Sequence, residues 1–468
     1  MAFVSLLVMT RCVANEYGVM MWGMAMVTLI NTVADLGFNS ANLKFIAKEG
    51  YDRSACFSSY MVIKAVLTVI MVLFVFCTVF YMDSTNVITD EMMNVCLIFL
   101  VYQVISNVQF AIFYTLDGLM MSGRSAILTI VECFIRNAIL IVLALMSVDA
   151  ETLSMSYVVA TSVSVVISIY MAYKAGLRMV RPIYLKEYYV FALPLAVALI
   201  LTSVVSSLDK VIIGLFYESI EVAYYSTAVG LIATFTTIGV SLNNVLLPYL
   251  SKNIENDKVT EHMLWSLERI MVIILGPFVA FFLVLGPQVA SVLFGPDFRT
   301  CGEMIAILSI QIIPFAIAGI MTQVLYAINR GKSYLRASAF MCIIAVAGFL
   351  VLIPNQTFMS FCMGYGGIGA SVAIVVAYVV FMFTLLWMVK KSTKFRFYPK
   401  IWKSGIAFLA SLLLLYGMEY FLEVEGLIMV AIAGLLCEAL FIIILYAMKE
   451  IRKKDLAIIW KKFRDDED

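Results

Sequence analysis

Fourteen apolar stretches, separated by short polar gaps, constrain this chain more than any other feature of its sequence. Most contain about 20 residues, the length that an α-helix needs to cross a hydrocarbon core roughly 30 Å thick. They lie near residues 1–11, 18–38, 56–82, 92–116, 124–147, 152–173, 188–216, 222–249, 268–294, 302–328, 334–354, 366–389, 402–423 and 426–448. Charged residues make up only 13% of the chain, too few to cover a soluble core of this size. The sequence therefore predicts an all-α integral membrane protein with about 14 transmembrane helices.

The positive charges predict the orientation of these helices. Of the 32 Lys and Arg residues, 27 fall in every second gap between the apolar stretches or in the C-terminal tail. Basic loops stay on the cytoplasmic side of a membrane. We therefore expect a multi-pass protein of the cytoplasmic membrane with both termini in the cytoplasm.

The rest of the composition excludes several classes of function. The net charge is +1, which leaves no surplus basic surface, so we expect no nucleic acid partner. The nine cysteines show no metal-binding spacing, and we expect neither a metal site nor a cofactor. The gaps between the stretches are too short for a folded soluble domain, which excludes most enzymes. Many helices with thin loops instead predict a transport path.

A faint internal repeat predicts two lobes. The segment 16–48 resembles the segment 221–252, at a spacing of six helices. An even number of helices gives both copies the same orientation and a pseudo-twofold axis along the membrane normal. We therefore expect an N-terminal lobe of six helices at 1–180 and a C-terminal lobe of six at 181–392, with the cavity between them. Residues 393–468 then form an appendage of two helices and a basic cytoplasmic tail.

Several short motifs occur in an order and spacing that resemble one known family. They are Arg11 with Glu16-Tyr17-Gly18, Ala34-Asp35-Leu36-Gly37, Lys44-Phe45-Ile46-Ala47, Leu193-Pro194-Leu195, Leu208-Asp209-Lys210-Val211-Ile212-Ile213-Gly214, Glu221 with Tyr224-Tyr225-Ser226, Leu293-Phe294-Gly295, Asn329-Arg330-Gly331-Lys332, and Pro354 with Gly366-Gly367-Ile368-Gly369-Ala370. Across most of its length the chain resembles the Wzx-type polysaccharide or oligosaccharide flippases, whose superfamily also contains the multidrug and toxic compound extruders. It departs from the family at the start, where a shortened first helix is expected before Arg11.

The resemblance implies a transporter that flips a polyprenyl-phosphate-linked oligosaccharide from the cytoplasmic to the outer leaflet by alternating access, for cell-surface polysaccharide or glycan biosynthesis. The implied partners are that lipid-linked oligosaccharide, membrane lipids and other proteins of envelope polysaccharide assembly. The main alternative is a small-molecule exporter of the related extruder type, coupled to Na⁺ or H⁺. A membrane enzyme or scaffold of envelope assembly is a third class.

Three basic residues lie inside apolar stretches, where each would cost about 2.5 to 3.5 kcal/mol at a helix centre without a purpose or partner. They are Lys64, Arg136 and Lys210. An anionic lipid headgroup needs such cations, so we predict that all three contact its phosphate. Arg136 should lie closest to the membrane midplane. The alternative for Arg136 is a salt bridge with Glu132, four residues earlier on the same helical face.

The acidic residues near these cations are candidates for coupling or for salt bridges. Adjacent residues on a helix point about 100° apart, so we expect Asp209 and Lys210 to face different partners. Asp209 would then couple transport to a cation or proton, with structural pairing as the alternative. Asp35 is expected to join the cations of the cytoplasmic loops. Lys64 should guide substrate access or extend to the lipid headgroups.

Intramembrane amides complete the predicted site, because they supply donors and acceptors for sugar hydroxyls. They are Asn31, Gln103, Asn107, Asn137, Asn243 and Gln311. The alternative role for these residues is to hold neighbouring helices together through hydrogen bonds.

Overall fold

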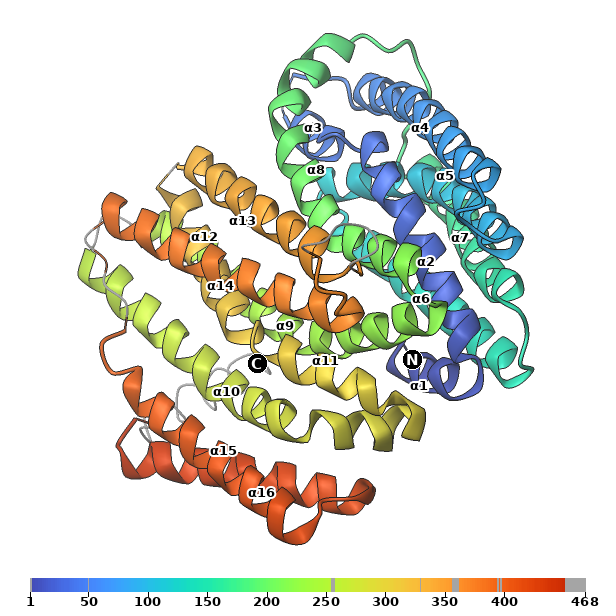
Figure 1. The fold of residues 1–468 in the computed structure, drawn as a ribbon. Coiled ribbons are helices and arrows are strands. Elements are labelled where there is room, and N and C mark those ends of the chain that lie inside the picture. The colour runs from blue at the N-terminus through green and yellow to red at the C-terminus, as the bar shows by residue number, and fades with distance from the viewer. Residues whose placement is uncertain are drawn as a thin grey trace. The chain divides into compact units, whose positions relative to one another are not determined.

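The structure is a computed structural model that describes residues 2–48, 50–253, 257–328, 330–355, 362–393, 395 and 398–450 (Figure 1). Within these residues it is α-helical, with two short 3₁₀ helices and no strand. The α-helices are α1 (Ala2–Cys12), α2 (Ala14–Asn31), α3 (Phe38–Ile46), α4 (Arg53–Ser84), α5 (Asp90–Gly118), α6 (Ser122–Leu145), α7 (Ala150–Lys174), α8 (Leu185–Phe216), α9 (Ser219–Asn253), α10 (Asp257–Phe294), α11 (Arg299–Ser309), α12 (Ile312–Ala327), α13 (Gly331–Leu352), α14 (Gly366–Ser392), α15 (Trp402–Leu422) and α16 (Gly426–Ala447).

The prediction of an all-α membrane protein is confirmed. Twelve helical segments among the described residues are long and apolar enough to cross a membrane, with α11 and α12 forming one of them. Each predicted apolar stretch corresponds to such a segment, to the 32-residue α8, or to the 11-residue α1. The predicted basic tail lies outside the described residues from position 451 onward.

The chain forms two compact units. The first contains residues 1–227 and 342–370, and the second contains residues 228–341 and 371–468. The predicted lobes at 1–180 and 181–392 rest on the internal repeat, which these units do not test, and they stay a prediction.

Helix α2 forms the centre of the first unit, where it packs against α5 and α8. Trp22 of α2 is fully buried, and its Nε1 atom donates a hydrogen bond of 3.2 Å to the carbonyl of Val211 in α8. Glycines allow α2 to approach both α8 and the start of α9 closely. A Cβ atom at Gly214 would lie 2.0 Å from the Trp22 ring, and one at Gly18 would lie 1.9 Å from the carbonyl oxygen of Ser219.

The second predicted stretch, 18–38, is not a single helix. Helix α2 ends at Asn31, a 3₁₀ turn follows at Thr32–Ala34, and Leu36 and Gly37 have positive φ angles of 41° and 83°. Glycine tolerates this left-handed backbone, which ends the helix and redirects the chain. The short amphipathic helix α3, which the sequence did not predict, begins directly afterwards and buries Phe38 and Phe45.

In the second unit, prolines interrupt the helices. The stretch 302–328 divides into α11 and α12, because Pro314 lacks an N–H group and its ring crowds the carbonyl four residues earlier, at Ile310. Helix α10 bends at Leu285, two residues before Pro287. The predicted site residue Gln311 therefore lies at a break between two helices.

The C-terminal helices α15 and α16 lie side by side in Figure 1 and pack against α10 within the second unit. The end of this pair is fixed by a buried carboxylate, Glu450, whose Oε2 atom lies 3.1 Å from the Lys403 Nζ atom. Lys403 also donates a hydrogen bond of 2.7 Å to the carbonyl of Met448. Tyr398 donates a hydrogen bond to Glu450, and burial raises the pKa of Tyr398 to about 12.

Candidate substrate-binding site

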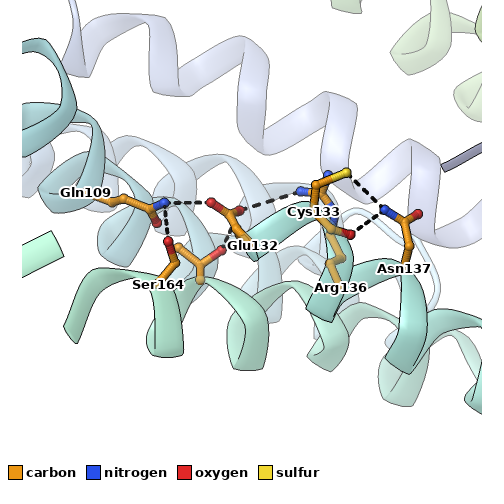
Figure 2. A network of polar contacts seen from close by, with 7 residues as sticks. Gln109, Glu132, Cys133, Arg136, Asn137 and Ser164 are labelled. Atoms are coloured by element: carbon orange, nitrogen blue, oxygen red, sulfur yellow. Dashed lines mark hydrogen bonds and ion pairs between the residues drawn. The ribbon is translucent and has the colours of Figure 1, made fainter. Parts of the chain in front are cut away.

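A network of polar side chains surrounds Glu132 on α6 in the first unit. Gln109 of α5 donates hydrogen bonds of 2.6 Å to Glu132 Oε2 and 2.9 Å to Ser164 Oγ. Thr161 of α7 donates a hydrogen bond of 3.1 Å to Glu132 Oε1. Figure 2 shows Gln109, Glu132 and Arg136 in sequence along this network. Because three helices supply its members, the network fixes the carboxylate in position.

Arg136 lies at one end of this network. Its Nη1 atom is 3.6 Å from Glu132 Oε1, the i to i+4 pair that the sequence analysis gave as the alternative to phosphate binding. The guanidinium also lies over the Tyr157 ring, 4.9 Å from its centre. Its side chain is 25% exposed, and it donates no hydrogen bond within the described part of the chain. An arginine has five N–H donors, so the network orients Arg136 without using its capacity to bind an anion.

Lys64 on α4 is paired with Asp35, which corrects two expectations. The Lys64 Nζ atom lies 3.9 Å from Asp35 Oδ1, and the lysine side chain is buried. Lys64 therefore does not extend to the lipid headgroups, because a fixed carboxylate compensates its charge in the interior. Asp35 pairs with this helical cation rather than with a cation of a predicted cytoplasmic loop.

Asp209 and Lys210 contact each other, so the expectation that they face different partners is wrong. Lys210 Nζ lies 3.7 Å from Asp209 Oδ1, and Tyr225 of α9 donates a hydrogen bond of 2.7 Å to Asp209 Oδ2. Lys210 Nζ also lies 5.8 Å from the Tyr225 ring centre and donates a hydrogen bond to the carbonyl of Ser206. The reason is the length of lysine, whose flexible side chain folds back across one helical turn.

The four predicted amides of the first unit have protein partners. Asn107 donates a hydrogen bond of 2.8 Å to Asn31, and Gln103 donates one of 3.1 Å to Thr28. Asn137 donates to the carbonyl of Cys133 at 2.6 Å, a contact drawn in Figure 2, and accepts a hydrogen bond from Ser5 at 2.5 Å. These contacts join α2 to α5 and α1 to α6, which is the helix-linking role given as the alternative to sugar binding.

The two predicted amides of the second unit differ from these. Asn243 donates a hydrogen bond of 3.4 Å to the carbonyl of Ala316, and its Oδ1 atom has no hydrogen-bond partner among the described residues. Gln311 Oε1 is likewise buried without a partner there. Both amides therefore keep an acceptor for a further contact. Binding of sugar by any of the six amides stays a prediction.

Sequence reasoning missed several members of these networks. Gln109 carries the same signal as Gln103, an amide inside an apolar helix, and could have been found by it. Thr161 and Ser164 have no such signal, because small hydroxyl side chains are common in membrane helices and bond to their own backbone. Tyr225 stood in a recognised motif, but its contact with Asp209 depends on how α8 and α9 pack.

Comparisons with known proteins agree with this architecture. Residues 8–303 match the Polysacc_synt_3 family, described as polysaccharide biosynthesis protein. The chain belongs to this family. No curated protein matches the sequence. Lys64, Arg136, Asp209 and Lys210 lie within the matched residues, and Gln311 lies beyond them.

Solved structures share the fold of this chain. A structure of the lipid II flippase MurJ in an inward closed conformation has a TM-score of 0.78 at 13% sequence identity, covering 96% of this chain and 97% of that chain. A multidrug resistance MATE family transporter of the MOP superfamily, in an inward-facing conformation, has a TM-score of 0.66 at 12% identity and covers 83% of this chain and 93% of that one. At this identity the likeness establishes a common fold.

Proposed function

We propose that the protein is a transporter that flips a polyprenyl-phosphate-linked oligosaccharide from the cytoplasmic to the outer leaflet by alternating access. The family match to polysaccharide biosynthesis proteins supports a role in making a cell-surface polysaccharide or glycan. The shared fold with a lipid II flippase supports a lipid-linked cargo. The proposed partners are this cargo, membrane lipids and other proteins of envelope polysaccharide assembly.

The observation that carries this proposal is the state of Arg136. Its guanidinium is held by Glu132 at 3.6 Å and by the Tyr157 ring, yet none of its N–H groups is used within the described residues. A planar guanidinium binds phosphate through two parallel hydrogen bonds. The network therefore presents a partly exposed, oriented cation inside an apolar bundle, where a lipid phosphate needs one.

Coupling to Na⁺ or H⁺ is part of the proposal, with Asp209 as the carboxylate that responds. Its side chain is 5% exposed, and it is the acceptor for Tyr225 and the partner of Lys210. Protonation or cation binding at Asp209 would weaken its attraction to Lys210 and free that lysine for the headgroup phosphate. Glu132 and Asp35 are likewise the acidic partners of Arg136 and Lys64.

A small-molecule exporter is the second candidate, because the MATE family transporter shares the fold. The match to a polysaccharide biosynthesis family favours the flippase. The two functions differ in cargo, so a single assay with both classes of substrate separates them.

The test is a flipping assay with a fluorescent polyprenyl-diphosphate oligosaccharide in proteoliposomes. We expect Arg136→Ala to lower the flipping rate at least about tenfold, since a charge-assisted hydrogen bond contributes roughly 1.5 to 3 kcal/mol. Arg136→Lys keeps the charge but loses the planar geometry, so it should restore only part of the rate. Arg124→Ala, which removes the same charge at the start of α6, serves as the control and should flip normally.

Two results would contradict the proposal. Unchanged flipping by a folded Arg136→Ala protein would exclude this arginine from phosphate binding. A wild-type protein that leaves the lipid-linked sugar in place but exports small organic cations would establish the exporter instead.

A further inference from the structure

Aromatic side chains from α3, the loop after it and the start of α8 form one cluster on the first unit. The ring centre of Phe45 lies 5.6 Å from that of Tyr51 and 5.9 Å from that of Phe191. Tyr51 in turn lies 4.8 Å from Tyr184. Phe45 is buried, and Tyr51, Tyr184 and Phe191 are partly buried around it. Tyrosine is enriched at the boundary between hydrocarbon and water, so Tyr51 and Tyr184 are suited to an edge of this cluster that meets lipid headgroups.

Three lysines adjoin the cluster. Lys44 Nζ lies 4.0 Å from the ring centre of Phe191, and Lys48 Nζ lies 5.1 Å from that of Tyr51. Lys44, Lys48 and Lys186 are all exposed, and none forms an ion pair with an acid that the structure describes. The rings orient two of these cations, whose charges remain available to an anion.

A groove of ≈ 520 Å³ opens against the same residues. Its lining consists of Phe45, Lys186, Glu187, Val190 and Phe191. Most of the wall is apolar, and Lys186 supplies a positive charge to it. Lys44 adds a second cation over the ring of Phe191, another residue of the lining. Glu187 is exposed and is the single acid of the lining. The groove thus combines an apolar wall with cations, which suits an amphiphilic anion.

An apolar track continues from this groove along α8. Val190, Leu193, Val197 and Ile200 are exposed and recur every three or four residues, so they lie on one face of the helix. From Val190 to Ile200 the helix rises about 15 Å. This length is about half of a hydrocarbon core roughly 30 Å thick, the depth of a single leaflet.

We propose that this groove binds a resident anionic phospholipid, with its phosphate at Lys44 and Lys186 and an acyl chain along the exposed face of α8. The length of the track fits the acyl chain of one leaflet. The lipid phosphate supplies an anionic partner for the exposed lysines, which form no ion pair within the described residues. None of these residues belongs to the pairs around Lys64, Arg136 or Lys210, so the proposed lipid site uses residues other than those proposed for the transported substrate.

The test is native mass spectrometry of the purified full-length protein titrated with phosphatidylglycerol or phosphatidylcholine. The wild type should retain one phosphatidylglycerol more tightly than any phosphatidylcholine. Lys44→Gln combined with Lys186→Gln should weaken this binding about 30-fold, because each cation near an anionic lipid contributes to the attraction. An unchanged thermal unfolding midpoint would show that the variant is folded.

A matched control removes two charges elsewhere. Lys390→Gln combined with Lys391→Gln acts at the end of α14, where Lys391 Nζ lies 5.3 Å from the Trp387 ring centre. This variant should bind phosphatidylglycerol as the wild type does. A third variant, Val190→Asn, keeps every lysine but makes the apolar wall polar. It should weaken phosphatidylglycerol binding if the acyl chain contacts this wall.

Each opposite result overturns the proposal. Equal retention of the two lipids, or no loss in the Lys44 and Lys186 variant, would exclude a headgroup site. Competition by glycerol 3-phosphate as strong as that by phosphatidylglycerol would mean a site for phosphate alone. Displacement by a polyprenyl phosphate at equal concentration would assign the groove to the transported lipid.

Discussion

Each of the three cations predicted to lie within the membrane is paired with an acid. Lys64, Arg136 and Lys210 lie 3.9 Å, 3.6 Å and 3.7 Å from Asp35, Glu132 and Asp209 respectively. An isolated charge in the bilayer costs about 2.5 to 3.5 kcal/mol, so a cation within a helix needs a compensating carboxylate. All three pairs lie in the first unit. A ligand of these cations therefore meets a charge that an acid already compensates, while the N–H donors of Arg136 stay open within the described residues.

At the residue scale we expect Asp209→Asn to destabilise the protein by about 3 to 5 kcal/mol, because it leaves the buried Lys210 charge unpaired. Thermal unfolding in detergent measures this loss. The control is the double variant Asp209→Asn with Lys210→Met, which removes both charges and should be more stable than Asp209→Asn alone. Lys210→Met alone completes the cycle. If the losses of the two single variants add up in the double variant, the pair does not stabilise the fold in the way that the geometry implies.

At the scale of elements, glycines set how closely α2 approaches its neighbours. The Cβ position at Gly18 would lie 1.9 Å from the Ser219 carbonyl oxygen, and that at Gly214 would lie 2.0 Å from the buried ring of Trp22. A backbone atom such as the Ser219 oxygen cannot turn aside as a side chain can. The start of α9 therefore rests directly on α2, and Tyr225 is held where it reaches Asp209.

We expect Gly18→Ala to destabilise the protein by about 1 to 3 kcal/mol, because α2 and α9 must move apart to admit the methyl group. Gly123→Ala on α6 is the matched control, since a Cβ atom there would meet no atom within 4 Å. The control should be neutral or slightly stabilising. Unfolding midpoints of both variants measure the difference, and a Gly18→Ala protein as stable as the control would refute the close contact.

At the scale of the whole molecule, the distribution of basic residues predicts which loops face the cytoplasm. The gap between α4 and α5 contains no Lys or Arg, whereas the gap after α7 contains Arg178 and Arg181. This orientation is a prediction that rests on charge alone.

Cysteine labelling in intact cells tests this orientation. The nine native cysteines are free and would first be replaced. Thr85→Cys, in the gap after α4, should react with a membrane-impermeant maleimide from outside. Lys174→Cys, at the end of α7, should react only after the membrane is permeabilised. The reverse pattern would invert the topology and place both termini outside.

The positions and order of the long apolar segments could be predicted from the sequence, because a span needs about 20 apolar residues wherever it lies in the bundle. The same holds for the pair Glu132 and Arg136, whose spacing of four residues fixes them on one face of α6. The break at Asp35-Leu36-Gly37 was missed because its apolar neighbours continue the stretch 18–38 and hide the turn. The helix α3 was missed because it is short and amphipathic and lies in the gap after that stretch.

The tertiary structure alone decided which partners meet across helices. Asp35 with Lys64, Tyr225 with Asp209, and Gln109 and Thr161 with Glu132 are separated in sequence by 16 to 29 residues. Helical periodicity relates only residues within a turn or two of one helix, so it cannot place such pairs. Packing of one helix against another brings them together. The same packing orients Arg136 between Glu132 and the Tyr157 ring, with its N–H groups available to a ligand. The sequence by itself determined that the chain crosses a membrane many times, because hydrophobicity acts locally along the chain.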